Sequence, residues 1–419
     1  MRFTERMSRI TVSQTAAVVA KAAKLKASGA KVVDFGAGEP DFPTPANVKR
    51  AAVQALEQDF TKYTPTGGIP ELKKAIVERH ARDFGSNYTP EECLVTVGGK
   101  QAVFEAIVGT IQKGDEVILP VPYWVSFLDI IRYAGGNAVL LETREEDDFA
   151  VRAIDIERLI TPKTRMIIVD SPNNPTGAVV PQEEMEKILA LAERHNLWLM
   201  SDECYCHFVY DGEKPFSLGI SKNRENLLVA GSLSKTYAMT GWRIGFALGS
   251  TQLLAQMLSL QSHSTSNASS ITQKAAVEAL SGPQDSVAAM LAEYDRRRQR
   301  IVAGLRSIPG LRCSLPKGAF YVYPNVAAYL AGESLADTTV LADRLLDEAS
   351  LALVPGPAFG TSEHVRISYA TSQEQIDEGL QRLNAFFAGR MPKGLTLPRR
   401  RIPHGGEASV LEDDLIESV

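Results

Sequence analysis

The sequence has 419 residues, 44% of them hydrophobic and 23% charged, and a formal net charge of −5. This composition is ordinary for a soluble globular protein, and the length exceeds what one hydrophobic core usually supports, so we expect two domains. The weak negative charge gives no reason to expect nucleic acid or an anionic membrane as a partner. No apolar run approaches a membrane span and the N-terminal segment lacks an apolar signal core, which favours a cytoplasmic protein.

The four cysteines are too few for a disulfide framework in a chain of this length. Cys204 and Cys206 are separated by one residue and have no second Cys/His pair near them in the sequence, which is poor zinc geometry. We therefore expect no metal site.

The N-terminal segment predicts an amphipathic helix at 15–27, a short strand at 32–35 and then a loop rich in glycine and proline. Thr44-Pro45 predicts a helix N-terminus, with Thr44 as its cap and Pro45 as its first residue.

The middle of the chain alternates apolar runs with helical periods. The runs that predict strands are 94–97, 116–119, 166–170, 197–201 and 227–230, and the predicted helices between them are 101–111, 124–134 and 181–195. This alternation predicts a mostly parallel sheet covered by helices. Ligands of such sheets bind at the carboxyl ends of the strands.

The C-terminal third predicts a long charged helix at 294–306, followed by a second α/β region that ends near residue 389. Residues 390–419 have few apolar anchors and predict a mobile tail.

Lys235 follows the last predicted strand, in the segment Ser232-Leu233-Ser234-Lys235. A lysine at a strand end can condense with an aldehyde if the site lowers its pKa. Ser232 and Ser234 offer hydroxyls, and Arg243 offers a planar fork for a phosphate dianion. These groups together suit an aldehyde cofactor that carries a phosphate, whereas a lone Ser-Lys would more often lie in a polar surface loop.

The segment 232–245 resembles the cofactor-lysine motif of the class I/II pyridoxal-phosphate (PLP) aminotransferases, which have fold type I, and the likeness extends from about Gly36 to Ala370. The resemblance implies pyridoxal 5′-phosphate as cofactor, a large domain with a mostly parallel central sheet at 46–285, and a smaller α/β domain built from 1–45 and 286–389.

Asp202 ends the apolar run 197–201, which places a carboxylate at the carboxyl end of a strand. PLP needs such a counter-charge at its pyridine nitrogen. Asp202 and Tyr205 match the Asp-x-x-Tyr element of the family, although a lone Asp here would more often cap a helix.

Asn174 lies in the loop Ser171-Pro172-Asn173-Asn174-Pro175-Thr176-Gly177, which two prolines make rigid. It resembles the family asparagine that binds the cofactor's phenolate oxygen. The Asn174–Pro175 bond is a candidate cis peptide, because cis bonds occur mainly before proline.

A second wall for the phosphate is predicted at the start of the helix at 101–111. Gly99, Lys100 and Gln101 combine close backbone approach with free helix-terminal amides, which bind anions. Trp124 offers a ring to stack on the pyridine, with a core tryptophan as the alternative.

The resemblance also assigns residues to the substrate and to a partner subunit. Arg366, in an alternating strand pattern, matches the arginine that binds the substrate α-carboxylate, and Gly38 resembles the backbone contact to the same group. Tyr63 matches the tyrosine that reaches the neighbouring subunit's phosphate, which implies a homodimer with shared active sites.

The chain departs from the animal-type aspartate enzymes at 261–267, where no Arg or Lys is present to bind a distal carboxylate. The bacterial subgroup that the chain resembles has a lysine at the position of Lys100, which can serve instead.

The expected reaction is ping-pong transamination between L-aspartate and 2-oxoglutarate, with Lys235 as the proton-transfer group. The alternatives are an aminotransferase for aromatic, prephenate or alanine-type substrates, and a PLP lyase of the same fold. A PLP-binding regulator is a further alternative, but it would need a DNA-binding domain that the residues before Gly36 are too few to form.

Overall fold

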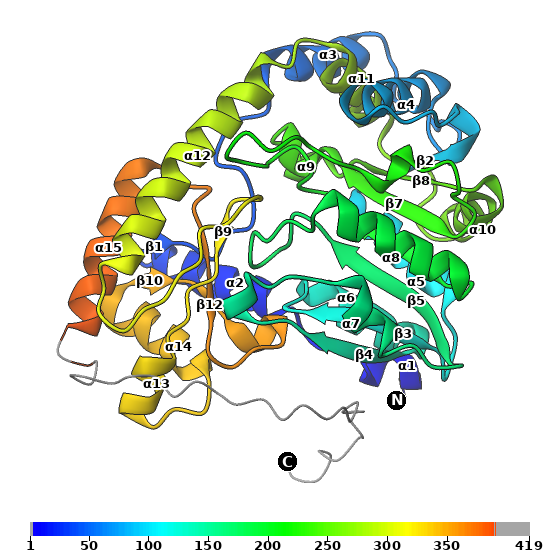
Figure 1. Ribbon diagram of the computed structural model, residues 1–419. Coiled ribbons are helices and arrows are strands. Elements are labelled where there is room, and N and C mark those ends of the chain that lie inside the picture. Colours follow the sequence, from blue (N-terminus) through cyan, green and yellow to red (C-terminus); the bar gives the residue numbers. More distant parts are fainter. Residues whose placement is uncertain (1–2, 389, 391–419) are drawn as a thin grey trace.

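The centre of the protein is a seven-stranded sheet with the order β2-β8-β7-β6-β5-β3-β4. This computed structural model describes residues 3–388 and 390 (Figure 1). The parallel strands are β3 (Glu116–Val121), β4 (Asn137–Glu142), β5 (Thr164–Asp170), β6 (Trp198–Asp202) and β7 (Leu227–Ser232). Strand β8 (Gly245–Gly249) is antiparallel to both β7 and β2 (Cys93–Thr96). The prediction of a mostly parallel sheet is confirmed.

Successive strand residues point to opposite faces of this sheet, and both faces are apolar. Helices therefore cover both faces. One face is covered by α4 (Pro70–Phe84), α8 (Gln182–Arg194) and α11 (Ser270–Ser281). The opposite face is covered by α5 (Gly99–Thr110), α6 (Val125–Ala134) and α10 (Thr251–Ser262). On β5, for example, Ile167 packs in the first core and Ile168 in the second.

A second region lies at the C-terminal end of α12 (Asp285–Arg306), the long helix at the upper left of Figure 1. It holds a parallel pair, β1 (Val33–Asp34) with β10 (Leu351–Ala352), and an antiparallel sheet in the order β11-β12-β9. Strands β9, β11 and β12 span Tyr321–Val322, Val354–Pro355 and Val365–Ser368. The helices of this region are α2 (Gln14–Ala27), α13 (Ala327–Glu333), α14 (Thr338–Ala349) and α15 (Gln373–Phe387).

The β1–β10 pairing brings the two ends of the described chain into one region, with Val33 opposite Leu351. A separate hydrophobic core, containing Phe35, Tyr294, Phe320 and Leu383, holds this region together. The domain boundaries at residues 45 and 285 stay a prediction, and the predicted tail at 390–419 lies, apart from Arg390, outside the described residues.

Two predicted helix starts are wrong. Helix α3 spans Ala46–Glu57, and Thr44 does not cap it, because the Thr44 hydroxyl donates to the carbonyl of Ala238 at 2.6 Å. The predicted helix at 294–306 is the second half of α12, which already begins at Asp285. At Thr44 a distant contact, rather than local propensity, decides the outcome.

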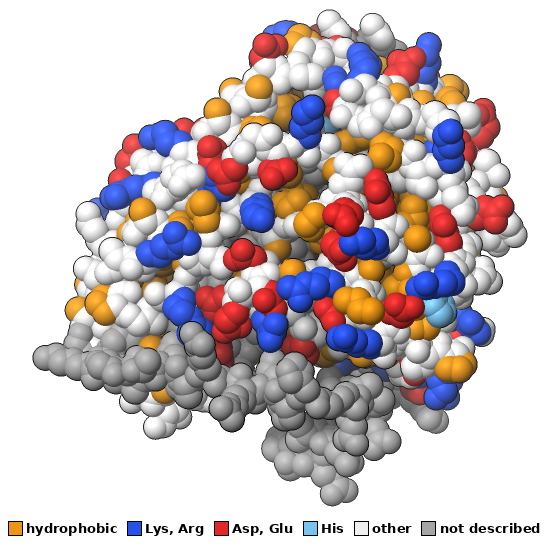
Figure 2. Space-filling model, in the orientation of Figure 1, with side chains coloured by type: hydrophobic (Ala, Val, Ile, Leu, Met, Phe, Trp, Pro, Cys, Tyr) orange, Lys and Arg blue, Asp and Glu red, His pale blue; other side chains and the backbone are white. Residues whose placement is uncertain are grey.

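The surface in Figure 2 carries acidic and basic side chains interspersed over the whole face, without a large region of one sign. In the described part of the chain, no helix has the length and apolar character that crossing a membrane requires.

Candidate active site

The candidate site lies where β5, β6 and β7 end. Asp170 and Asp202 are the last residues of β5 and β6, and they are Cα partners across the parallel pair. Strand β7 leads directly into the short helix α9 (Leu233–Thr236), which carries Lys235. The parallel register therefore brings two carboxylates and an amine to one edge of the sheet.

Lys235 lies in a largely water-excluded position, which disfavours its charge. Its Nζ donates to the carbonyl oxygen of Gly38 and lies 6.0 Å from the ring centre of Tyr205. Burial lowers the pKa of Lys235 to about 8, even though Cys204 and Glu39 raise it. A substantial fraction of the amine is therefore neutral near pH 8, which is the nucleophilic form.

Asp202 has a buried carboxyl neighbour that the sequence analysis missed. Asp202 Oδ1 accepts from the amide of Cys204 at 3.1 Å, and burial raises the pKa of Asp202. Asp170 Oδ2 accepts from the amide of Asn174 at 3.1 Å, and burial followed by the charge of Asp202 raises the pKa of Asp170 well above its usual value. Asp170 ends a predicted strand as Asp202 does, so the sequence contained a signal for it.

Tyr205 lies in the buried aromatic wall of the site. Its hydroxyl is 2.7 Å from that of Tyr321, another residue that the sequence analysis did not single out. The guanidinium of Arg366 lies 4.6 Å from the ring centre of Tyr321. Tyr321 therefore contacts both Tyr205 and Arg366, two of the predicted site residues.

Arg366 and Asn174 meet beside the glycine-rich loop at 36–38. Arg366 is buried, and it donates from Nη1 to Asn174 Oδ1 at 3.1 Å and from Nη2 to the carbonyl of Gly36 at 2.7 Å. Its Nε has no hydrogen-bond partner among the residues that the structure describes. A Cβ at Gly38 would lie 3.7 Å from both terminal nitrogens of Arg366, so the loop approaches the arginine closely.

The candidate cis bond at Asn174–Pro175 is wrong. The cis bonds in the described chain are Ser171–Pro172 and Val121–Pro122. A tight turn held by the Gly177 amide on the Asn173 carbonyl, at 2.9 Å, accommodates Asn174–Pro175 in the trans form.

Three glycines bring the backbone and Arg243 close together at the start of α5. A Cβ at Gly98 would lie 2.5 Å from Arg243 Nη2, and one at Gly245 would lie 2.4 Å from the nitrogen of Gly99. Arg243 is exposed and adopts a left-handed φ of 54°, with Nη1 donating to the Thr240 carbonyl at 2.8 Å. This cradle can hold an anion.

The two serines of the lysine segment differ in position. Ser232 Oγ accepts from the amide of Ser234 at 3.0 Å and caps α9, whereas Ser234 itself is buried. A Cβ at Gly99 would lie 3.1 Å from the Ser232 Cβ, so Ser232 adjoins the cradle.

Lys100, Trp124 and Gln101 flank the cradle in different ways. Lys100 is exposed, and its Nζ lies 5.0 Å from the ring centre of the half-buried Trp124. Burial of the amine and the charge of Arg243 lower the pKa of Lys100. The side chain of Gln101 is instead bonded to the Val97 amide at 2.5 Å and to Glu105 at 2.7 Å, so its predicted contact to a cofactor stays a prediction.

Tyr63 is far more exposed than the other candidate residues. It lies in the loop between α3 and α4, with 91% of its surface accessible. Its predicted contact to a neighbouring subunit's phosphate stays a prediction.

A half-buried lysine of lowered pKa, near strand-end carboxyls and a buried arginine, defines a site for small molecules that carry amino and carboxylate groups. The chain belongs to the aminotransferase class I and II family, whose model matches residues 30–383. It is therefore an aminotransferase, and the predicted family is confirmed.

Individual relatives agree over nearly the whole chain. An aspartate aminotransferase of a Bacillus species is 42% identical over 91% of this chain and 98% of its own. An aspartate/prephenate aminotransferase of Thermus thermophilus is 45% identical over 90% of this chain and 96% of its own. The solved Thermus thermophilus aspartate aminotransferase with maleate has a TM-score of 0.87 and 43% identity, covering 92% of this chain and all of that one. The predicted fold type is confirmed.

Proposed function

We propose that this chain uses pyridoxal 5′-phosphate to exchange amino groups between L-aspartate and 2-oxoglutarate, in two half-reactions with ping-pong kinetics. The observation that carries the proposal is the convergence of Lys235 and Arg366 on one loop. Lys235 Nζ donates to the carbonyl of Gly38, and Arg366 donates to that of Gly36. An amine-handling group and a carboxylate-binding group are thus spaced for a single α-amino acid.

The chain's own residues fit the cofactor. The close approach of Gly98, Gly99 and Gly245 leaves backbone amides and Arg243 around an anion-sized cradle, beside Ser232 and Ser234. Asp202 supplies a buried carboxylate for a pyridinium nitrogen, Asn174 and Tyr205 supply polar groups for the ring oxygen, and Trp124 supplies an aromatic face. When bound, the cofactor takes up electrons released at the substrate Cα and carries the amino group between the two half-reactions.

Lys235 is the proposed general base and acid. Its pKa of about 8 lies near the working pH, where a group both accepts and returns a proton efficiently. Its Nζ removes the proton from the substrate Cα and later returns one. The aromatic rings of Tyr205 and Phe320, about 6.0 and 5.9 Å from Nζ, keep water away from this path.

Arg366 is the proposed partner of the substrate α-carboxylate. It is already oriented by Asn174 and Gly36, and its buried Nε lacks an acceptor in the described chain. A buried charged donor without a partner is costly, so an arriving carboxylate is strongly favoured.

The identity of the distal group is proposed from the relatives and from Lys100. One relative is named for prephenate as well as aspartate, and one solved relative is a structure with maleate, a dicarboxylate. Lys100 is the exposed cation beside Trp124 that could meet a second carboxylate. Prephenate is therefore the second candidate substrate, because it also carries two carboxylates.

We also propose a homodimer with shared active sites and a two-domain division at residues 45 and 285, with 286–389 joining the N-terminal segment. The exposed Tyr63 supports the shared sites, and the separate core around Phe35 and Leu383 supports the division.

Borohydride reduction of the purified holoenzyme tests the proposal. The expected result is cofactor mass on the peptide that contains Lys235 and on no other lysine. An amino-donor panel with 2-oxoglutarate should rank aspartate first, and Lys235→Ala should lower turnover by at least the roughly 10²–10⁴-fold of a positioned acid/base. Cofactor mass on another lysine, or no cofactor mass on any lysine, contradicts the assignment.

A further inference from the structure

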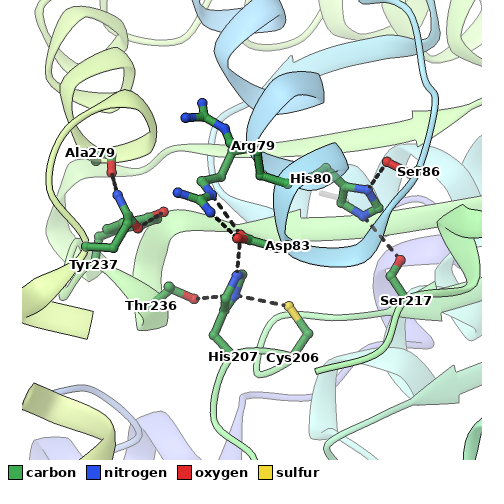
Figure 3. Close-up of polar contacts among 12 residues, drawn as sticks. Arg79, His80, Asp83, Ser86, Cys206, His207, Ser217, Thr236, Tyr237 and Ala279 are labelled. Atoms are coloured by element: carbon green, nitrogen blue, oxygen red, sulfur yellow. Dashed lines mark hydrogen bonds and ion pairs between the residues drawn. The ribbon is translucent and has the colours of Figure 1, made fainter. Parts of the chain in front are cut away.

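A second polar cluster lies outside the candidate site, between α4 and the loop that follows β6. Figure 3 shows Asp83 between Arg79 and His207, with Cys206 and Thr236 close to the other side of the His207 ring. His207 Nε2 is 2.9 Å from Asp83 Oδ2, and His207 Nδ1 is 3.3 Å from the Sγ of Cys206. A thiol, an imidazole and a carboxylate are therefore arranged in line.

The carboxylate of Asp83, at one end of this line, is held in place by Arg79. Arg79 Nε donates to Asp83 Oδ2 at 2.9 Å, and Arg79 Nη2 also bonds Asp83 Oδ1. Burial would raise the pKa of Asp83, but His207 and Arg79 lower it below its usual value. Asp83 is thus a charged partner that holds the imidazole in place.

His207 is an imidazolium at neutral pH. Burial lowers its pKa, but Cys206 and Asp83 raise it more, to about 10. His80, which lies on the same helix as Asp83, differs from His207 in the direction of its pKa shift. It is hydrogen-bonded to Ser86 at 2.7 Å and to Ser217 at 3.2 Å, and burial lowers its pKa to about 3, so it is neutral.

Among the chain's four cysteines, Cys206 alone has a cationic hydrogen-bond partner. Burial raises the pKa of Cys93 and of Cys313 to about 12. Burial and the charge of Asp202 raise the pKa of Cys204 well above its usual value. A thiol beside an imidazolium is the arrangement that favours the reactive thiolate.

The cluster adjoins a small cavity of about 40 Å³. It is lined by Cys206, His207, Asp83, Arg79 and Thr236, together with other polar and apolar side chains. This volume admits a molecule of the size of water or peroxide, since one water needs about 10–15 Å³ on this measure, but not a peptide or an amino acid.

We propose that Cys206 is a modification site for small hydroperoxides, with His207 and Asp83 as the groups that activate its thiol. The thiolate sulfur attacks one peroxide oxygen, so that an S–O bond forms as the O–O bond breaks. Sulfur loses two electrons to the peroxide, and the departing hydroxide takes the proton of the His207 imidazolium to leave as water. The product is a sulfenic acid beside a neutral imidazole.

The test exposes the full-length holoenzyme to limiting hydrogen peroxide and then unfolds it in excess dimedone-type trap, because the cavity does not admit the trap; peptide mass spectrometry reads the adducts. The expected result is an adduct on Cys206 ahead of Cys204, the matched control two residues away, and no adduct on that peptide in Cys206→Ala. An adduct that forms on Cys204 first, or a Cys206 without adduct after peroxide treatment, overturns the proposal.

Two substitutions distinguish the effect of the His207–Asp83 pair from that of other cavity residues. Asp83→Asn keeps the side-chain shape but removes the carboxylate, and should slow labelling roughly tenfold, because the imidazole loses the charged hydrogen-bond partner that orients it toward Cys206. His80→Gln lines the same cavity and should leave the rate unchanged. Equal rates in Asp83→Asn and the unsubstituted protein overturn the role of the carboxylate.

Discussion

At the scale of single residues, the least expected feature is the second carboxyl beside Asp202. Asp170 and Asp202 are paired across β5 and β6, and both are buried at the end of their strands. Two such carboxylates cannot both stay charged at low cost, so one of them holds a proton. Burial raises the pKa of both carboxyls, and the charge of Asp202 raises that of Asp170 further, so we expect Asp170 to hold the proton and Asp202 to stay charged for the cofactor.

Replacing Asp170 tests this assignment. Asp170→Asn keeps an acceptor for the Asn174 amide and mimics a neutral carboxyl, so PLP affinity and the Asp202 pKa should both be retained. The acidic limb of the kcat/KM profile should then stay at the same pH. Asp170→Ala leaves the Asn174 amide unpartnered, at a cost of about 1–3 kcal/mol, and should weaken PLP binding measured by absorbance titration. An equal loss of affinity in both variants would show that Asp170 must be charged.

Lys100 is the residue for which we predict a specificity role. Its ammonium lies over the Trp124 ring at 5.0 Å and is exposed, so it can reach a second carboxylate of the substrate. A hydrogen bond to a charged group contributes about 1.5–3 kcal/mol. Lys100→Ala should therefore lower kcat/KM for aspartate and glutamate by roughly 10–150-fold while sparing alanine and phenylalanine.

Lys100→Arg, which keeps the charge, is the control and should retain most of the preference for acidic donors. An equal loss for all donors in Lys100→Ala would mean that Lys100 neutralises the cofactor phosphate instead.

At the scale of elements, local pattern sufficed where a strand or helix is defined by its own periodicity. The predicted strand at 166–170 and the predicted helix at 181–195 agree with β5 (Thr164–Asp170) and α8 (Gln182–Arg194) to within two residues. The strand-end position of Asp202 was predicted for the same reason, because an apolar run ends at that residue.

Other features depend on contacts that no local pattern contains. Thr44 bonds Ala238, 194 residues away, and so cannot cap the helix beside it. The pairing of Asp170 with Asp202 follows only from the strand register. His207 and Asp83 are 124 residues apart in the sequence, so no local pattern predicts their contact.

The same contact joins α4 to the loop after β6 and should make stability depend on pH. His207 has a raised pKa of about 10 in the folded state, so its contribution is complete below the unfolded value of about 6.5 and is lost as pH rises toward 10. His207→Gln should lower the free energy of unfolding by about 1.5–3 kcal/mol near pH 6, and by much less near pH 10. Urea unfolding at both pH values, under reducing conditions, measures the difference.

His80→Gln is the matched control for this prediction. The folded pKa of His80 is lowered to about 3, so its neutral form contributes stability that is not lost as pH rises. An effect of His207→Gln that is the same at both pH values would show that packing alone, and not the ion pair, accounts for the loss.

At the scale of the whole molecule, Tyr63 differs from the lysine, the carboxyls and the arginine in its exposure. That side chain is 91% exposed, and Val53 and Leu56 of the preceding helix α3 are about half exposed, at 52% and 50%. An exposed tyrosine beside exposed apolar side chains is typical of an interface. If a two-fold partner covers this face, Tyr63 of each subunit enters the site of the other.

Mixing two inactive variants distinguishes this arrangement from a self-contained subunit. In a hybrid of Tyr63→Ala and Lys235→Ala subunits, one site carries both defects and the other carries neither, provided that Tyr63 serves the partner. Complete subunit exchange should then restore about a quarter of the unsubstituted activity, because half of the dimers are hybrids and each has one intact site. If Tyr63 served its own subunit, both hybrid sites would carry one defect and the mixture would show only the sum of the separate activities. Light scattering on the same samples establishes that the species tested is a dimer, and a monomer with full activity would contradict the shared site.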